Sequence, residues 1–177
     1  QFMNSSTSII SGLGEETGVI GLSGGANMAT WIAQYNSANI SRALLLSPFY
    51  QPSASEMPAW QSPLLRNLYG RDILPDSFSA GSNLSYRALG KYMIIAKNYK
   101  SDFKAPGLKH IGVITSENDT VIDMRLANNI PKQIATASNA KFQSYSIPAS
   151  FGIGHDIVAL SQDEIKKHVN KLYPFYL

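Results

Sequence analysis

The stretch VIGLSGGANM, residues 19–28, places a serine among glycines where an apolar run gives way to small residues. Gly21 and Gly25 flank Ser23 at positions minus two and plus two, and Gly24 follows the serine directly. The apolar run before Ser23 is typical of a buried strand, and residues 26–35 after it have helical spacing of apolar side chains. The stretch therefore predicts a strand, a sharp turn with Ser23 at its tip, and a helix.

The glycines and the serine have separate expected roles in this turn. A side chain at Gly21 or Gly25 is expected to collide, because the strand must reverse directly into the helix. The turn would present the Ser23 hydroxyl above the sheet and point the Gly24 N–H toward the oxygen of a carbonyl group that Ser23 has attacked. Because G-x-S-x-G also arises by chance, the alternative is a flexible turn in which Ser23 only caps the helix.

The strand and helix signals repeat along the rest of the chain. Further strands are predicted over residues 43–46, 111–115 and 142–147, and further helices over residues 124–137 and 162–172. Three of the four predicted strands are continuous apolar runs, as expected for a parallel sheet that helices cover on both faces. This βαβ series predicts an α/β fold of three layers with a mostly parallel sheet.

One connection, between residues 49 and 108, is far longer than the crossovers of compact domains. Its first part is proline-rich, and residues 83–99 have helical spacing. We interpret residues 50–107 as a cap inserted over one end of the sheet, and residues 1–49 and 108–177 as the core. The large side chains of this segment would form either the core of the cap or an apolar wall for a substrate: Tyr50, Trp60, Leu64, Leu65, Tyr69, Tyr86, Tyr92 and Met93.

A serine hydroxyl is a poor nucleophile without a base, and the chain offers three histidines as candidates. His110 opens the apolar run HIGVIT, which predicts a residue at the end of a strand. His168 lies in the pattern IKKHVNKL, which predicts a solvated helical residue. His155 lies in SFGIGHDIVAL, a loop with flanking glycines after the last predicted strand, where its ring would reach the strand ends. His155 is therefore the predicted base.

An acid that orients the histidine is expected at the carboxyl end of a strand, where parallel sheets display their working residues. Asp119 follows the strand over residues 111–115 directly. Asp123 falls at the start of the next helix, where a capping aspartate is the ordinary expectation. Glu117 and Asp156 are weaker candidates. The predicted catalytic residues are Ser23, Asp119 and His155.

Through its GLSGG, SENDTV and GIGHD motifs, the chain resembles the C-terminal portion of an α/β-hydrolase, from the nucleophile elbow onward. The resemblance implies that Ser23 is the nucleophile, His155 the general base and then acid, Asp119 its orienting carboxylate, and Gly24 an oxyanion donor. It implies a carboxylesterase-like serine hydrolase that cleaves a small-molecule ester through an acyl-enzyme. A thioesterase, peptidase or acyltransferase would use the same residues, and a non-catalytic binding protein of this fold is the alternative from another class.

The resemblance also implies strands before the elbow, whereas only 18 residues precede residue 19 here. Residues 3–18 resemble just the helix that leads into the elbow strand. Without neighbours this strand would be an exposed apolar edge, which natural proteins avoid. We therefore expect that the chain, which begins with Gln1, is cut from a longer one, and that an N-terminal segment or a second chain completes the sheet.

Composition excludes several other classes of function. The net charge of +3 comes from scattered basic residues, which argues against nucleic acid as a partner. The absence of cysteine excludes a disulfide framework, a thiolate metal site and a cysteine nucleophile. No apolar run approaches the roughly 18 residues of a membrane span. We expect neither a metal nor an organic cofactor.

Overall fold

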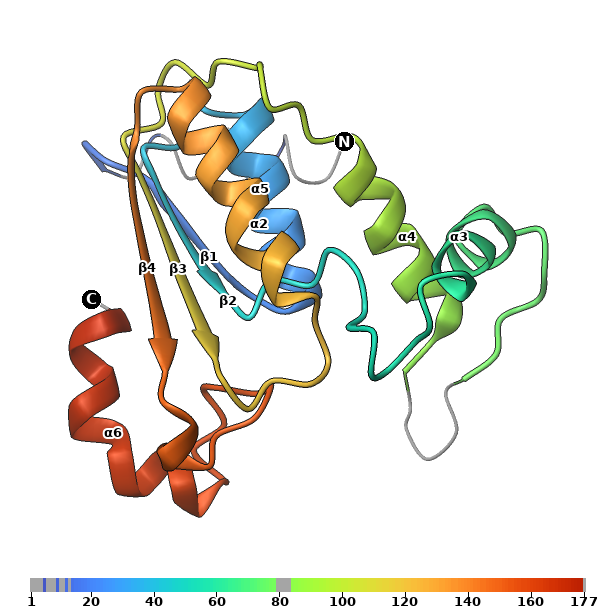
Figure 1. Ribbon diagram of the computed structural model, residues 1–177. Helices are drawn as coiled ribbons and strands as arrows, with labels where there is room; N and C mark the ends of the chain where they lie inside the picture. Colours follow the sequence, from blue (N-terminus) through green and yellow to red (C-terminus); the bar gives the residue numbers. More distant parts are fainter. Residues whose placement is uncertain (1–4, 6–8, 10–11, 13, 79–83, 177) are drawn as a thin grey trace.

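The computed structural model describes residues 5, 9, 12, 14–78 and 84–176. Its centre is a parallel sheet of four strands in the order β1-β2-β3-β4 (Figure 1). The strands are β1 Gly18–Leu22, β2 Arg42–Leu46, β3 His110–Ser116 and β4 Lys141–Ile147. All four predicted strands are confirmed, and each begins one residue earlier than predicted. In the register, Leu22, Leu46 and Ile114 lie side by side, so the strands end at a common edge.

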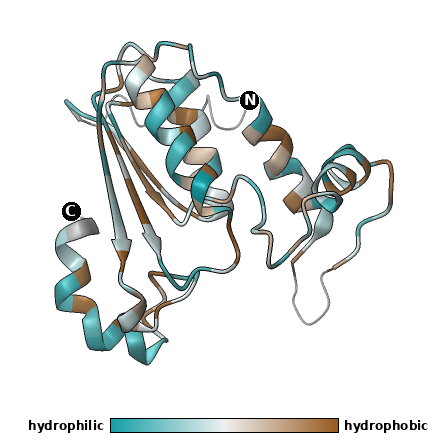
Figure 2. Cartoon of the chain, in the orientation of Figure 1, coloured by the Kyte–Doolittle hydropathy of each residue, from teal (hydrophilic) through white to brown (hydrophobic). Residues whose placement is uncertain are grey.

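Helices pack on both faces of this sheet, as predicted. Figure 1 shows α2 (Gly24–Tyr35) and α5 (Met124–Ala137) against one face and α6 (Asp163–Tyr176) on the other side. Alternate residues of the strands divide between two apolar clusters. Ala43, Leu45 and Val113 pack with alanines of α2 and α5, whereas Leu46 and Ile114 pack with Ile165 and Leu172 of α6. Figure 2 shows hydrophobic segments on strands behind the largely hydrophilic outer side of α5.

The observed helices differ from the predicted ranges only at their ends. Helix α2 begins at Gly24, two residues before the predicted start, because the chain turns directly at Ser23. Helix α5 has the predicted bounds. Helix α6 begins one residue later than predicted and continues through Pro174 to Tyr176.

The segment between β2 and β3 holds the short helix α3 (Gln61–Leu64), the π-helix η1 (Leu65–Tyr69) and the helix α4 (Tyr86–Lys97). Helix α4 lies within the range predicted to be helical, of which residue 83 lies outside the described residues. Ser85 caps α4, since its hydroxyl accepts a hydrogen bond from the Ala88 N–H at 3.0 Å. In Figure 1 this segment lies beyond α2, away from the sheet.

An apolar cluster joins this segment to the rest of the molecule. Leu65, Leu89 and Met93 pack with Ile122 and Ala127, which belong to the chain after β3. Of the eight large side chains singled out from the sequence, Trp60 and Leu64 are 67% and 49% exposed and contribute little to this cluster.

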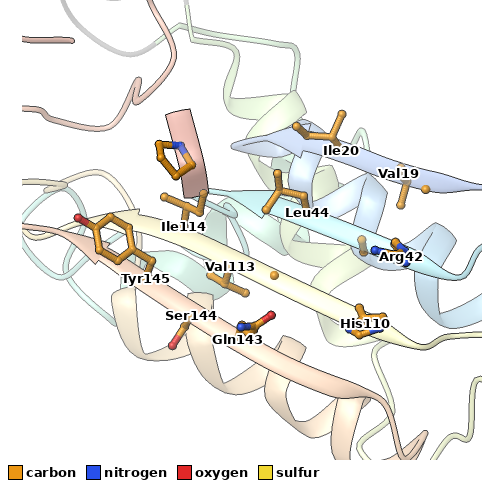
Figure 3. A pocket seen from close by; sticks show the side chains of 14 residues that line it. Val19, Ile20, Arg42, Leu44, His110, Val113, Ile114, Gln143, Ser144 and Tyr145 are labelled. Atoms are coloured by element: carbon orange, nitrogen blue, oxygen red, sulfur yellow. The ribbon is translucent and has the colours of Figure 1, made fainter. Parts of the chain in front are cut away.

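Within the described part of the chain, β1 is an edge strand of the sheet, and a groove lies over part of one face. Ile20 of β1 is 61% exposed. On the face opposite α2 and α5, Ile20, Leu44 and Ile114 border a groove of about 570 Å³ (Figure 3). The helix that residues 3–18 resemble falls largely outside the described residues. Among the residues that are described, no helix is both long and apolar enough to cross a membrane.

Candidate active site

The turn between β1 and α2 holds Ser23 in an unusual backbone conformation. Ser23 has φ 54° and ψ −119°, and a positive φ of this kind costs a residue with a side chain about 1–3 kcal/mol. Two backbone hydrogen bonds hold it there. The Ser23 N–H donates to Leu46 O at 2.8 Å, and the Phe49 N–H donates to Ser23 O at 3.1 Å. The end of the neighbouring strand β2 and the loop after it therefore fix the turn that presents Ser23.

Of the three glycines around Ser23, two lie at crowded positions and one does not. A Cβ on Gly21 would lie 2.3 Å from Gly25 O, so the predicted collision is confirmed there. At Gly25 the prediction is wrong, because an added Cβ would meet no atom within 4 Å and the residue faces outward from the first turn of α2. Gly24 is the second crowded position, since its Cβ would lie 2.5 Å from the Tyr92 ring. Sequence reasoning assigned Gly24 a role only for its N–H.

The three residues predicted from the sequence lie in one chain of hydrogen bonds. His155 Nε2 is 2.8 Å from Ser23 Oγ, and His155 Nδ1 is 2.8 Å from Asp119 Oδ2. A carboxylate only accepts hydrogen bonds, so Nδ1 carries the proton and Nε2 is left to accept from the Ser23 hydroxyl. The Asp119 side chain is fully buried. A histidine in this arrangement can take a proton from a serine hydroxyl, and a carboxylate can orient that histidine.

The Ser23 side chain makes no capping hydrogen bond to α2. Its oxygen is instead bonded to the histidine 132 residues away in sequence. This contact argues against the alternative in which the serine serves only as a helix cap. Gly24 is the first residue of α2, and the first N–H groups of a helix have no acceptor within it. The Gly24 N–H is therefore suited to bind an anion next to Ser23.

The other acidic candidates have structural partners. Asp123 caps α5, because its Oδ1 accepts from the Leu126 N–H at 3.0 Å, as expected for a residue at a helix start. Asp156 is exposed, and its Oδ1 accepts from Val158 N at 3.4 Å. Glu117 accepts from a backbone N–H of the segment that leads to His155. None of these contacts reaches the histidine ring.

The two remaining histidines lie away from Ser23. His110 is the first residue of β3, as predicted. His168 lies in α6, but it is half-buried rather than solvated. Its ring stacks on Phe151 with centroids 4.0 Å apart and an angle of 7° between the rings. The prediction of a solvated residue was wrong because Phe151, on the segment before His155, covers one side of the imidazole.

Sequence reasoning missed a set of contacts that positions the segment carrying His155. The Glu117 carboxylate accepts from the Ala149 N–H, and the Asn118 amide donates to Ala149 O, both at 2.8 Å. The Ser116 hydroxyl donates to Ile153 O. All four side chains of the sequence SEND, residues 116–119, therefore bind residues 149–155. The signal available in the sequence was the unbroken run of polar residues after an apolar strand.

No group of three or more His, Asp or Glu residues within the described part of the chain is arranged to hold a metal ion. The chain of hydrogen bonds at Ser23 joins a hydroxyl, an imidazole and a carboxylate, which are groups suited to acid–base and nucleophilic chemistry.

Comparisons with known proteins agree on the fold. No protein-family model matches the sequence, and no curated protein matches it. A soluble variant of monoglyceride lipase from Saccharomyces cerevisiae is similar in structure, with a TM-score of 0.68 and 16% identity over 98% of this chain and 66% of that one. The monoacylglycerol lipase of Paleococcus ferrophilus has a TM-score of 0.63 and 18% identity, over 98% of this chain and 73% of that one. A thermostable carboxyl esterase from Bacillus coagulans has a TM-score of 0.61 and 14% identity, over 97% of this chain and 67% of that one.

These similarities cover almost all of this chain and about two thirds to three quarters of each solved structure. The chain has the α/β-hydrolase fold, with the parallel sheet and flanking helices described above, and does not span the remaining third or quarter of those chains. The resemblance inferred from the GLSGG, SENDTV and GIGHD motifs is confirmed at the level of the fold.

Proposed function

We propose that this protein is a serine hydrolase that cleaves a carboxylic ester through an acyl-enzyme, in the manner of a carboxylesterase. The observation that carries the proposal is the pair of 2.8 Å contacts of His155, one to Ser23 Oγ and one to the buried Asp119 carboxylate. The esterase and lipases of the same fold support the choice of an ester as substrate.

The first half of the proposed reaction forms the acyl-enzyme. Ser23 Oγ attacks the carbonyl carbon of the ester, and its proton passes to His155 Nε2. The Asp119 carboxylate stabilises the imidazolium that results. The oxyanion of the tetrahedral intermediate accepts a hydrogen bond from the Gly24 N–H. The intermediate then collapses as His155 returns the proton to the departing alcohol oxygen, which leaves the acyl group on Ser23.

The second half releases the acid. His155 Nε2 takes a proton from a water molecule, whose oxygen attacks the acyl carbon of the ester on Ser23. A second tetrahedral intermediate forms and is held by the same N–H. When it collapses, His155 protonates Ser23 Oγ, and the carboxylic acid departs. The reaction consumes one water and one ester, and the Ser23–His155 pair returns to its initial state.

A fluorophosphonate label tests this proposal directly, because it reacts with a serine only when a base activates the hydroxyl. We expect the folded protein to be labelled, with mass spectrometry of the digested protein placing the adduct on Ser23. Heat-denatured protein is the control, and it should remain unlabelled. Folded protein that stays unlabelled would instead support a non-catalytic binding protein, and an adduct on another serine would contradict the assignment of the nucleophile.

We also propose the division of the chain into a core, residues 1–49 and 108–177, and a cap, residues 50–107. Support comes from α4, which contacts the elbow: the Tyr92 ring occupies the space where a Gly24 side chain would lie. A segment in this position would bound the substrate on one side. The cap is also held to the core by the apolar cluster around Met93 and Ile122.

The proposal includes a polypeptide segment that completes the sheet beside β1, either from the same protein or from a second chain. Support comes from the exposed Ile20, the groove of about 570 Å³ over the adjoining strands, and the third or quarter of the similar structures that this chain does not span. A parallel edge strand with an apolar face is a template for pairing with another chain.

We therefore expect residues 1–177 to self-associate when expressed alone, and the substitution Ile20→Lys to raise the monomeric fraction measured by light scattering. A charge on an edge strand opposes pairing with a second copy. Ile73→Lys is the matched control, because Ile73 is 63% exposed but lies outside the sheet. A monomeric wild-type chain, or equal effects of the two substitutions, would argue against an incomplete sheet.

A further inference from the structure

Tyr92 of α4 lies directly beside the residue that follows the nucleophile. A Cβ built on Gly24 would lie 2.5 Å from both Cε2 and Cζ of Tyr92, and 2.9 Å from its hydroxyl oxygen. One edge of the ring thus fills the space next to Gly24 that a side chain would otherwise occupy. Helix α4 belongs to a segment far from the elbow in sequence, so this contact is a product of the tertiary fold.

The backbone at Tyr92 is fastened to the elbow helix by a buried amide. Asn27 of α2 is fully buried, and its Nδ2 donates to Tyr92 O at 2.9 Å and to Phe49 O at 2.8 Å. The Tyr99 hydroxyl donates to Asn27 Oδ1 at 2.6 Å. Moving α4 away from α2 would break the hydrogen bond from the buried Asn27 amide to Tyr92 O, which is unfavourable.

A second buried amide of α2 holds the chain beyond the end of α4. Gln34 is fully buried, its Nε2 donates to Lys100 O at 2.7 Å, and its Oε1 accepts from the Lys100 N–H at 3.3 Å. Asn27 and Gln34 are seven residues apart, so they lie on the same face of α2. Helix α4, at Tyr92, and the chain just beyond its end, at Lys100, are therefore each tied to the elbow helix.

The ring of Tyr92 is also held, while its hydroxyl has no protein partner among the described residues. Phe49 packs against it edge to face, with centroids 6.4 Å apart at an angle of 69°. The ring is half-buried and borders the cluster that contains Leu89 and Met93. A ring held on two sides, by Phe49 and beside Gly24, acts as a rigid wall there.

We infer that Tyr92 is a specificity-determining residue, whose ring forms the α4 side of the substrate site and limits the size of the group bound next to Gly24. This inference rests on the proposed function, since it assigns Gly24 to the reacting carbonyl. Glycine at position 24 is the other half of the arrangement, because any side chain there would occupy the space of the ring. The two residues together set the width of the site.

The test compares two series of esters in the full-length protein. One series varies the acyl chain of p-nitrophenyl esters from acetate to decanoate, and the other varies the alcohol of acetate esters. We expect Tyr92→Ala to raise kcat/KM for large members relative to small ones by about tenfold or more in one series, which is the range for a change in an apolar pocket. Tyr92→Phe should leave the ratio unchanged, because the ring remains.

Two further variants separate an effect of the Tyr92 ring on selectivity from a general effect on folding. Tyr92→Leu keeps an apolar side chain against Phe49 and should shift the ratio in the same direction as Tyr92→Ala. Tyr173→Ala removes an exposed tyrosine of α6 and should leave the ratio at the wild-type value. Suppose that the wild type hydrolyses esters while Tyr92→Ala and Tyr92→Leu leave the selectivity unchanged in both series. That result would overturn the inference about Tyr92 but not the proposed function. A wild type that hydrolyses no ester would overturn the proposed function and the inference with it.

A double-mutant comparison tests the contact itself. Gly24→Ala should reduce kcat/KM strongly, because the new Cβ and the Tyr92 ring cannot both fit. Adding Tyr92→Ala empties that space, so the double variant should recover at least about tenfold over Gly24→Ala, as expected for residues in direct contact. A double variant no more active than Gly24→Ala would show that the ring does not define the space beside residue 24.

Discussion

Replacing Ser23 with alanine is expected to abolish nearly all ester hydrolysis while leaving the protein folded. Alanine removes the oxygen that lies 2.8 Å from His155 Nε2, so no acyl-enzyme can form. Loss of a nucleophile of this kind typically lowers kcat by about 10⁴-fold or more. The Ser23 side chain makes no capping hydrogen bond to α2, so its removal takes nothing from the helix start. Hydrolysis of p-nitrophenyl esters and thermal denaturation of the purified variant measure the two effects.

The matched control for this variant is Ser161→Ala, which makes the same chemical change at an exposed serine outside the hydrogen-bonded chain of Ser23, His155 and Asp119. It should retain wild-type activity. If Ser23→Ala kept more than a tenth of the activity, the assignment of Ser23 as nucleophile would be rejected. Because the proposed oxyanion donor, the Gly24 N–H, is a backbone group that this substitution leaves in place, a small residual rate is expected to remain.

The strands and the residues around Ser23 were predictable because their signals are local. A continuous run of apolar residues such as that of β3 can be buried only in a covered strand or helix, and its length favours the strand. The turn at Ser23 is also local, since glycine at position 21 is required by contact with Gly25 O four residues later. His155 and Asp119 followed from chemistry, because a serine nucleophile requires both a base and an acid.

The features that were missed depend on contacts between distant segments. The need for glycine at position 24 arises from Tyr92, and no spacing rule along the chain relates the two. Asn27 and Gln34 look like ordinary polar residues of a helix, yet both are fully buried because backbone carbonyls of the segment between β2 and β3 satisfy them. Such burial is visible only once the partner segment has a position.

The same distinction explains the error at Gly25. The general expectation for a strand that reverses into a helix is small residues on both sides of the turn. In this structure the backbone of Gly25, rather than its side-chain position, lies against Gly21. The absence of a side chain at Gly21 is therefore enough to let the two segments approach each other. Gly25 itself is exposed, and its side-chain position faces away from the turn.

Asp119→Asn is expected to lower kcat by roughly 10⁴-fold without unfolding the protein, because an amide can donate to Nδ1 and so favour the wrong histidine tautomer. With the proton on Nε2, His155 could no longer accept the Ser23 proton. The Oδ1 contact to the Val121 N–H at 2.9 Å can be kept by the amide oxygen, so the loop should retain its conformation. The kcat for p-nitrophenyl esters, measured beside thermal stability, separates the two effects.

Asp123→Asn is the matched control for this variant, four residues further along the same loop. Asn caps a helix about as well as Asp, so the hydrogen bond to the Leu126 N–H should survive and kcat should stay close to that of the wild type. The opposite result, a severe loss in Asp123→Asn and a mild one in Asp119→Asn, would move the acid to Asp123. Equally mild effects would leave His155 without an orienting carboxylate, and the proposed mechanism would then fail at its first proton transfer, since nothing else among the described residues contacts His155 Nδ1.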